Sequence, residues 1–154
     1  MSVHAFRARY RGMAWSAIGV GGALSAVAAA VGFAALPLAT GLIGVAFGAA
    51  YLGSPTWRYT VIADDDGLEV RTKAGPKFRI AWSEIVRVVA SPTTHTCFVD
   101  GGTPARSLLV PGDGAPAPYD LEDRPALVTT ILAHVPADKV TIVESLEQAK
   151  ASAP

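Results

Sequence analysis

The sequence predicts a membrane α-helical hairpin of two transmembrane helices, followed by a small α+β, mainly β, domain that ends in one amphipathic helix. Three observations lead to this fold class. The stretch from Gly12 to Trp57 contains no Asp, Glu, Lys, Arg or His over 46 residues. Short segments that alternate polar and apolar residues follow it, separated by turns rich in Gly and Asp. One apolar stripe with helical spacing lies near the C-terminus.

The uncharged stretch is long enough for two membrane crossings, because one crossing helix needs roughly 20 apolar residues. Pro37 lies near its middle and favours a helix boundary there, since proline has no backbone N–H to donate. We therefore expect helices at Met13–Ala34 and Pro37–Gly53, joined by a turn around Ala35–Leu36.

The charges beside the uncharged stretch predict its orientation. Up to Tyr59 there are four basic residues and no acidic ones, whereas from Thr60 onward there are nine basic and thirteen acidic residues. The four basic residues are Arg7, Arg9, Arg11 and Arg58. Lys and Arg are retained on the cytoplasmic side. We therefore expect a multi-pass protein of the inner (cytoplasmic) membrane with both its N-terminus and its C-terminal domain in the cytoplasm. The acidic balance of that domain argues against nucleic acid as a partner.

A cleaved signal peptide is the competing interpretation of the N-terminal part. Ala28–Ala30 resembles a small-residue cleavage region. The apolar stretch continues far beyond it, however, and its second half would still anchor the product. The expected organisation is a basic cytoplasmic segment at residues 1–11 and a transmembrane hairpin at residues 12–55. The aromatic residues Trp15, Tyr51 and Trp57 suit the headgroup level of the cytoplasmic side.

Small residues recur at helical spacing along both expected transmembrane helices. Such rows let helix backbones approach closely in lipid. The rows are Gly12, Ser16, Gly19 and Ala23 on the first helix, and Gly41, Gly44 and Gly48 on the second. One interpretation is that the rows pack the two helices against each other. The other is that they form a homo-oligomer or bind a partner membrane protein.

After Pro55 the pattern changes to strands. Trp57–Ala63 is rich in aromatic and β-branched residues and ends at the turn Asp64–Gly67. Apolar and charged residues then alternate through Leu68–Lys73, and again after a turn at Gly75–Pro76. Further strands are expected near residues 85–89, 96–99 and 106–110, with a turn around residues 100–102.

The last expected elements are a helix and a C-terminal extension. Asp123 is the expected N-cap, and Pro136 ends the helix. The apolar stripe consists of Leu127, Val128, Ile131, Leu132 and Val135. In the extension at residues 137–154, Val140–Val143 is a possible strand and Ser145–Ala151 a frayed helix or tail.

This order of elements resembles the bacterial pleckstrin-homology-like (PH-like) domain proteins. The residues that carry the resemblance are Trp57–Val61, Asp66–Leu68 and above all Phe78–Ile85. Ala81 stands where many members of the group have proline. The resemblance covers residues 57–136 and implies a bent antiparallel sheet or partly open barrel, capped by the C-terminal helix. It also implies a non-enzymatic module that binds proteins or lipids.

Four basic residues form the best functional patch in the sequence. Alternation places Arg71, Lys73, Lys77 and Arg79 on the solvent face of one hairpin, and their spacing resembles the basic loop by which PH domains hold phosphoinositide headgroups. Basic residues close to a membrane attract anionic lipid headgroups. The alternative is an ordinary solvated strand face, with Glu69 and Glu84 nearby.

No catalytic, cofactor-binding or metal-binding residues are expected. Asp64–Asp66 lacks the ligand spacing of a calcium loop and reads as a turn. His4, His95 and His134 lack metal-site spacing, although His95 and Cys97 would share one face of a strand. A buried core residue is the better interpretation of Cys97.

The expected function is a non-enzymatic integral membrane protein that presents a cytoplasmic PH-like module for interaction or scaffolding. A protein partner or a second copy of the chain is its expected partner, together with membrane lipid. The alternative is an accessory subunit of a transporter or other membrane complex, assembled through the small-residue helices.

Overall fold

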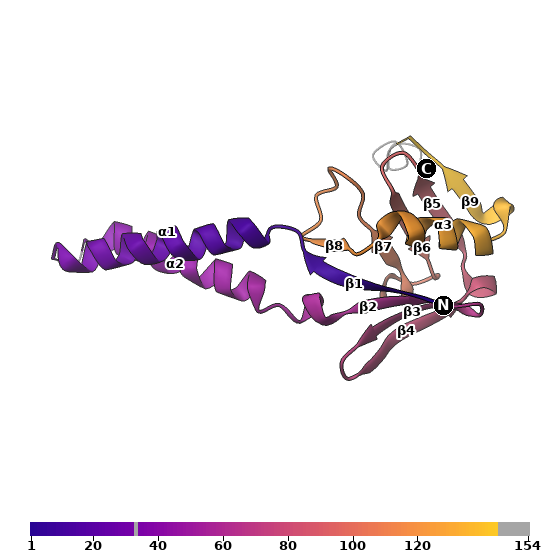
Figure 1. The fold of residues 1–154 in the computed structure, drawn as a ribbon, viewed down its shortest axis with the longest axis horizontal. Helices are drawn as coiled ribbons and strands as arrows, with labels where there is room; N and C mark the ends of the chain where they lie inside the picture. Colours follow the sequence, from indigo (N-terminus) through magenta and orange to yellow (C-terminus); the bar gives the residue numbers. More distant parts are fainter. Residues whose placement is uncertain (33, 145–154) are drawn as a thin grey trace. The chain divides into compact units, whose positions relative to one another are not determined.

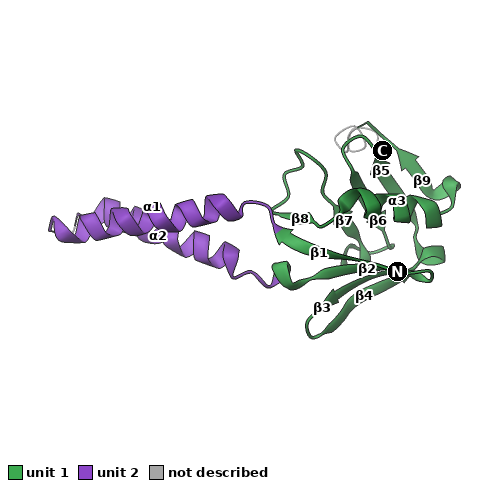
Figure 2. Ribbon diagram, in the orientation of Figure 1, with its two compact units in different colours: residues 1–7, 56–154 green, residues 8–55 purple. Residues whose placement is uncertain are grey.

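A computed structural model describes residues 1–32 and 34–144, which belong to two compact units (Figures 1 and 2). Residues 8–55 form a helical hairpin, and residues 1–7 together with those from 56 onward form what we call the sheet domain. Two long apolar helices and a mostly antiparallel sheet domain are therefore present, as the fold class predicted at this level. The tail expected at Ser145–Ala151 lies outside the described residues.

The hairpin consists of α1 (Arg11–Ala30) and α2 (Ala35–Leu52). Both predicted helices are confirmed, but the chain turns between Ala30 and Ala35 and not around Ala35–Leu36, since α2 already begins at Ala35. Gly32 has a φ of +99°, which glycine adopts without steric cost. Pro37 lies within the first turn of α2, where its missing N–H interrupts no intrahelical bond, so the helix begins two residues before it.

The N-terminal residues form a strand of the sheet domain, which the sequence analysis did not predict. Strand β1 (Ser2–Ala8) pairs antiparallel with β2 (Thr60–Ala63), with Ser2 opposite Ala63 and Ala5 opposite Thr60. The basic segment expected at residues 1–11 is thus mostly sheet. The hairpin is consequently an insertion between two paired strands.

The sheet domain contains a five-stranded and a four-stranded sheet. The five-stranded sheet has the order β4-β3-β2-β1-β8, and the four-stranded sheet has the order β7-β6-β5-β9. The strands not yet given are β3 (Gly67–Thr72), β4 (Gly75–Ala81), β5 (Arg87–Ser91), β6 (Thr96–Asp100), β7 (Leu108–Val110), β8 (Tyr119–Leu121) and β9 (Val140–Ile142). β9 pairs parallel with β5, whereas β1–β2, β2–β3, β3–β4, β5–β6 and β6–β7 pair antiparallel. The strand expected in the C-terminal extension is thus confirmed.

Short 3₁₀ helices interrupt the strand pattern. They are η1 (Pro55–Arg58), η2 (Trp82–Glu84), η3 (Pro104–Arg106) and η4 (Ala137–Lys139). The strand expected at Trp57–Ala63 therefore begins only at Thr60, because the preceding residues form η1.

Helix α3 (Arg124–His134) contributes the predicted apolar stripe to the core. Leu127, Val128, Ile131 and Val135 are buried together with inward-facing residues of both sheets, and Leu132 packs against them partly buried. Asp123 does precede the helix, but it adopts a left-handed conformation and its side chain makes no capping hydrogen bond. The N-cap position was therefore predicted correctly and its capping bond was not.

Candidate functional sites

The structure separates the four basic residues that the sequence analysis grouped into one patch. β3 and β4 form the expected hairpin, with Thr72 paired with Gly75, so the turn lies at Lys73 and Ala74 and not at Gly75–Pro76. A register shift after Val70 places an irregularity in this hairpin, and strict alternation fails there. The four side chains consequently have different surroundings.

Arg79 lies within a cluster of carboxylates. Its Nη2 atom donates to both oxygens of Asp64 at 3.0 Å, and its Nη1 atom donates to Glu69 at 3.3 Å. Asp66 lies 3.7 Å from the same guanidinium. Arg71 donates from Nε to the other oxygen of Glu69 at 2.8 Å. Glu69 is only 7% exposed, so two arginines neutralise a nearly buried carboxylate and hold the outer face of the hairpin together.

Lys77 is the residue that the register shift leaves without an opposite partner. Val70 pairs with Phe78 and Arg71 pairs with Pro76, so Lys77 is the extra residue between them. Its Nζ atom lies 5.2 Å from the centre of the Tyr59 ring, a cation–π arrangement. Lys77 therefore extends toward the beginning of β2 and away from Glu69.

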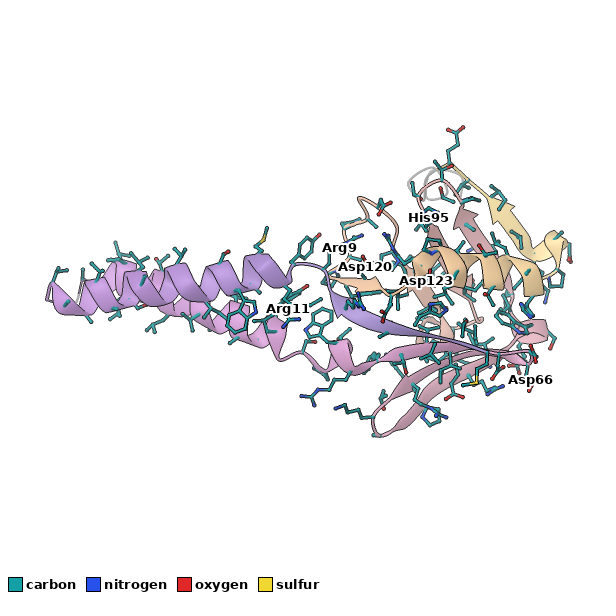
Figure 3. The ribbon with its side chains drawn as sticks, viewed as in Figure 1. Arg9, Arg11, Asp66, His95, Asp120 and Asp123 are labelled. Atoms are coloured by element: carbon teal, nitrogen blue, oxygen red, sulfur yellow. The ribbon has the colours of Figure 1, made fainter. Side chains whose placement is uncertain are left out.

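Along β2, β3 and β4, the charges are segregated between the two ends of the strands. At one end, Arg58 precedes β2, Lys73 lies in the β3–β4 turn, and Lys77 contacts Tyr59; we call these three residues the basic end. The β2–β3 turn at the opposite end carries Asp64, Asp65 and Asp66, and Glu84 follows β4 there; Asp66 is labelled in Figure 3. Arg79 belongs to this acidic end, which removes it from the predicted lipid-binding set.

Two carboxylates of the acidic end have lowered pKa values. Burial raises the pKa of Asp64, but the N–H groups of Gly67 and Asp66 and the Arg79 guanidinium together leave it below its ordinary value. The Ala81 N–H, followed by Arg106, lowers the pKa of Glu84. Asp64 in turn raises the pKa of Arg79. The aspartates thus serve a hydrogen-bonded turn, as the sequence analysis proposed.

In the hairpin, the predicted row on α2 faces α1. A Cβ atom added at Gly48 would lie 2.7 Å from the Ala14 carbonyl oxygen, and one at Gly44 would lie 3.3 Å from that of Ala17. A side chain at Gly41 would collide with Gly21 and Ser25. These glycines therefore lie where the backbones of α1 and α2 approach each other closely.

The row predicted on α1 lies on the wrong face for that packing. Gly12, Ser16, Gly19 and Ala23 are all exposed, and nothing lies within 4 Å of a Cβ atom added at Gly12 or Gly19. The residues of α1 that are buried are Ala14, Gly21 and Ala28, offset from the predicted row by about half a turn. Because α1 is rich in small residues on every side, the sequence alone did not distinguish these faces.

The histidines and the cysteine do not form a common site in the described part of the chain, and each has a structural role of its own. His95 has a φ of +52° in the turn before β6, so it does not share a strand face with Cys97 as expected. Cys97 is fully buried, and burial raises the pKa of its thiol to about 12. His134 stacks on Trp82 at 4.9 Å. Among the described residues, no three His, Cys, Asp or Glu side chains gather closely enough to hold a metal ion.

His4 is a buried residue whose role the sequence analysis missed. It is 2% exposed, and its Nδ1 atom lies 2.9 Å from the Glu122 carbonyl oxygen, while Nε2 lies 3.0 Å from the Ser2 hydroxyl. Its place in an alternating Ser2–Ala8 segment was the available signal, because apolar Phe6 faces the same side two residues later.

Arg124 is the second residue with an unpredicted role. It donates to the Pro111 carbonyl oxygen at 2.8 Å and to Asp113 at 2.7 Å, and its Nε atom lies 3.0 Å from Asp120. Asp120, labelled in Figure 3, stands four residues before it. These hydrogen bonds and ion pairs of Arg124 connect the Gly- and Pro-rich loop before β8 to the first residue of α3.

Comparisons of the chain with protein-family models, with curated proteins and with solved structures found no match in any of the three.

Proposed function

We propose that the protein is a multi-pass protein of the cytoplasmic membrane, whose sheet domain is a non-enzymatic PH-like module for interaction or scaffolding. The helical hairpin crosses the bilayer twice, and the sheet domain lies on the cytoplasmic side. Four lines of support come from exposure, connectivity, charge and the order of the strands.

The exposed surface of the hairpin carries the proposal. The large apolar side chains of α1 and α2 point away from their contact, as with Leu36 at 83% and Phe47 at 74% exposure. Others are Met13, Val20, Val27, Leu42 and Ile43. Helices of 20 and 18 residues extend about 30 and 27 Å at 1.5 Å per residue, close to the hydrocarbon thickness of a bilayer. An apolar surface of this extent is unfavourable in water and favourable in lipid.

Connectivity supports placing both ends of the hairpin on one side. β1 precedes the hairpin and β2 follows it, and their backbones pair over four residues. A chain with its N-terminus across the membrane from Thr60 would lose this pairing. Arg9, Arg11 and Arg58 flank the hairpin, and the positive-inside rule then favours the cytoplasm for that side.

The order of the sheet elements supports the PH-like assignment. β2-β3-β4 and β5-β6-β7 each run as antiparallel neighbours, and α3 follows them and buries its stripe in their common core. β1, β8 and β9 add to that arrangement. The ionic side chains described above mostly satisfy one another, as in the Glu69 and Arg124 clusters, and this supports a binding role over a catalytic one.

Cysteine labelling of intact cells tests the proposal. Native Cys97 is buried with a raised thiol pKa, so Ala34→Cys in the hairpin turn and Ala74→Cys in the β3–β4 turn each supply one accessible thiol. A membrane-impermeant maleimide is expected to label Ala34→Cys in intact spheroplasts and Ala74→Cys only after lysis. Extraction of the protein by alkaline carbonate, or identical labelling of both variants, would contradict the proposal.

A second candidate function is an accessory subunit of a transporter or other membrane complex. The exposed small-residue row of α1 favours it, because Gly12, Ser16, Gly19 and Ala23 would let another helix approach closely. Gly44 and Gly48 do not separate the two candidates, since they pack within the hairpin. The mass and composition of the complex purified from native membranes in mild detergent would do so. Loss of a stoichiometric partner in Gly19→Leu, with the sheet domain intact, would establish the second candidate.

A further inference from the structure

We propose that the basic end of the sheet, formed by Arg58, Lys73 and Lys77, contacts the anionic lipid headgroups of the membrane that the hairpin crosses. The inference rests on the proposed membrane function and adds a lipid partner to it. It replaces the predicted set of Arg71, Lys73, Lys77 and Arg79, because two of those arginines neutralise Glu69 and the aspartate turn.

The strand register gathers the three cations at one end. Thr60 pairs with Arg71, and Arg71 pairs with Pro76, so the residues just before β2 and the β3–β4 turn end at the same side of the sheet. The contact between Lys77 and the Tyr59 ring confirms this proximity across the strands. All three cations are exposed.

Within residues 1–32 and 34–144, no carboxylate lies within ion-pair distance of Arg58, Lys73 or Lys77. The other arginines at this end do have partners: Arg7 pairs with Glu122, and Arg71 pairs with Glu69. An unneutralised cluster of this kind suits a negatively charged surface.

The chain itself keeps this end close to the headgroups. β1 ends at Ala8 and α1 begins at Arg11, and three residues of extended chain span at most about 10 Å. On the return, α2 ends at Leu52 and β2 begins at Thr60, with η1 between them. The chain therefore leaves the sheet for the hairpin, and returns from it, at the basic end. If the helices cross the bilayer, this end of the sheet is the one nearest to the headgroups along the chain.

The acidic end supplies the opposite preference. The acidic end lies at the opposite end of the same strands from the β3–β4 turn and carries Asp65, Asp66 and Glu84. An anionic surface therefore attracts the basic end and repels the acidic end. Each cation near an anionic membrane surface strengthens the association of the basic end with that surface by a factor of about five. Removal of two cations would therefore weaken this association about 25-fold.

A fluorophore at the β3–β4 turn tests the contact. Full-length Ala74→Cys, labelled with an environment-sensitive dye, is reconstituted into nanodiscs of phosphatidylcholine alone or of equal parts phosphatidylcholine and phosphatidylglycerol. Quenching by acrylamide, which carries no charge, reports how much of the dye is exposed to water. We expect weaker quenching in the mixed nanodiscs, and we expect this difference to disappear in molar salt and in Lys73→Gln/Lys77→Gln. The matched control is Arg87→Gln/Arg106→Gln, which removes the same charge near Asp100 and Glu84 and should retain the difference.

Equal quenching in both kinds of nanodisc overturns the lipid contact and leaves the membrane hairpin untouched. Loss of the difference in the Arg87/Arg106 control as well would overturn the assignment to the basic end, because net charge alone would then suffice. Failure of the protein to remain with the nanodiscs would instead contradict the proposed membrane function.

Discussion

The hairpin and the sheet domain bury opposite kinds of residue. In the hairpin, the buried positions are Ala14, Gly21, Ala28, Gly41 and Gly48, and the large apolar side chains lie outside. In the sheet domain, large apolar side chains fill the core and the charged residues lie mainly outside. The difference is the one expected of the proposed membrane protein, because close packing of helix backbones favours helix association in lipid, whereas the burial of apolar area drives folding in water.

The boundary between these two regions does not follow the sequence order. Residues 1–7 precede the hairpin but belong to the sheet domain, where Phe6 packs against Tyr59 and Tyr119 with ring centres 5.9 and 5.0 Å apart. The domain core therefore closes only after the hairpin has been synthesised. The predictions below ask whether each region responds to substitution as the proposed environments, lipid for the hairpin and water for the sheet domain, require.

The largest effect is expected from Phe6→Ala, which tests whether β1 belongs to the domain core. Phe6 is buried, so the substitution should lower the free energy of unfolding of the sheet domain by about 3–5 kcal/mol. Chemical denaturation of the full chain in detergent measures it through the fluorescence of buried Trp82, with Trp15 and Trp57 replaced by Phe. Val3→Ala on the exposed face of the same strand is the control. Equal stability of the two variants would show that β1 is dispensable.

A leucine in each region gives a direct comparison of the two. Leu127→Ala in the domain core should lower the free energy of unfolding by about 2–5 kcal/mol, because it leaves a cavity. Leu42→Ala on the outside of α2 leaves no cavity, since that side chain is 56% exposed, and the same denaturation should show no change. Destabilisation of the sheet domain by Leu42→Ala would mean that the outer face of α2 is covered within the protein.

In the hairpin, a larger side chain should be destabilising at a glycine in the α1–α2 contact and tolerated at a glycine on the outer face. A side chain at Gly21 would meet the Gly41 carbonyl oxygen, with its Cβ atom only 2.5 Å away, so Gly21→Leu should weaken α1–α2 packing by about 1–3 kcal/mol. Gly19→Leu meets nothing within 4 Å and should leave that packing intact. Spin labels attached to cysteines introduced by Val20→Cys and Ile43→Cys measure the separation of the two helices by pulsed electron paramagnetic resonance. A distribution that widens equally in both variants would place Gly21 outside the contact.

The length of the uncharged stretch and Pro37 were enough to predict the two helices, and periodicity was enough to predict the β2–β4 meander and the core stripe of α3. Prediction failed where the structure of a segment depends on a partner that is distant in the sequence. Ser2–Ala8 alternates well enough for a strand, but its partner β2 lies beyond the hairpin, and no local signal predicts that pairing. The contact face of α1 was missed because Gly and Ala occur on all its sides, and only α2 distinguishes Gly21 from Gly19.

The surroundings of the four cations grouped in the sequence analysis were predicted only in part, for a related reason. Strict alternation put four cations on one face, but the irregularity at Lys77 redirects its side chain, and nearly buried Glu69 draws Arg71 and Arg79 to itself. Neither a bulge nor an ion-pair choice among several carboxylates follows from residue spacing. The turn at Asp64–Gly67, whose hydrogen bonds are local, was predicted correctly.

The smallest effect, acid sensitivity, should be confined to the sheet domain, because the hairpin has no acidic or basic side chain from Gly12 to Trp57. The Ala81 N–H and then Arg106 hold the pKa of Glu84 below its ordinary value of 4.5. A carboxylate with a lowered pKa stabilises the fold above its unfolded-state pKa, and that contribution is lost as the pH falls through the folded-state value. Glu84→Gln should therefore lower domain stability at neutral pH and flatten its decline below pH 4.5, while Asp65→Asn, at an exposed position in the same acidic end, should do neither. Denaturation curves recorded across that pH range distinguish the two variants, and an unchanged acid decline in Glu84→Gln would assign the sensitivity to other carboxylates, Asp64 first among them.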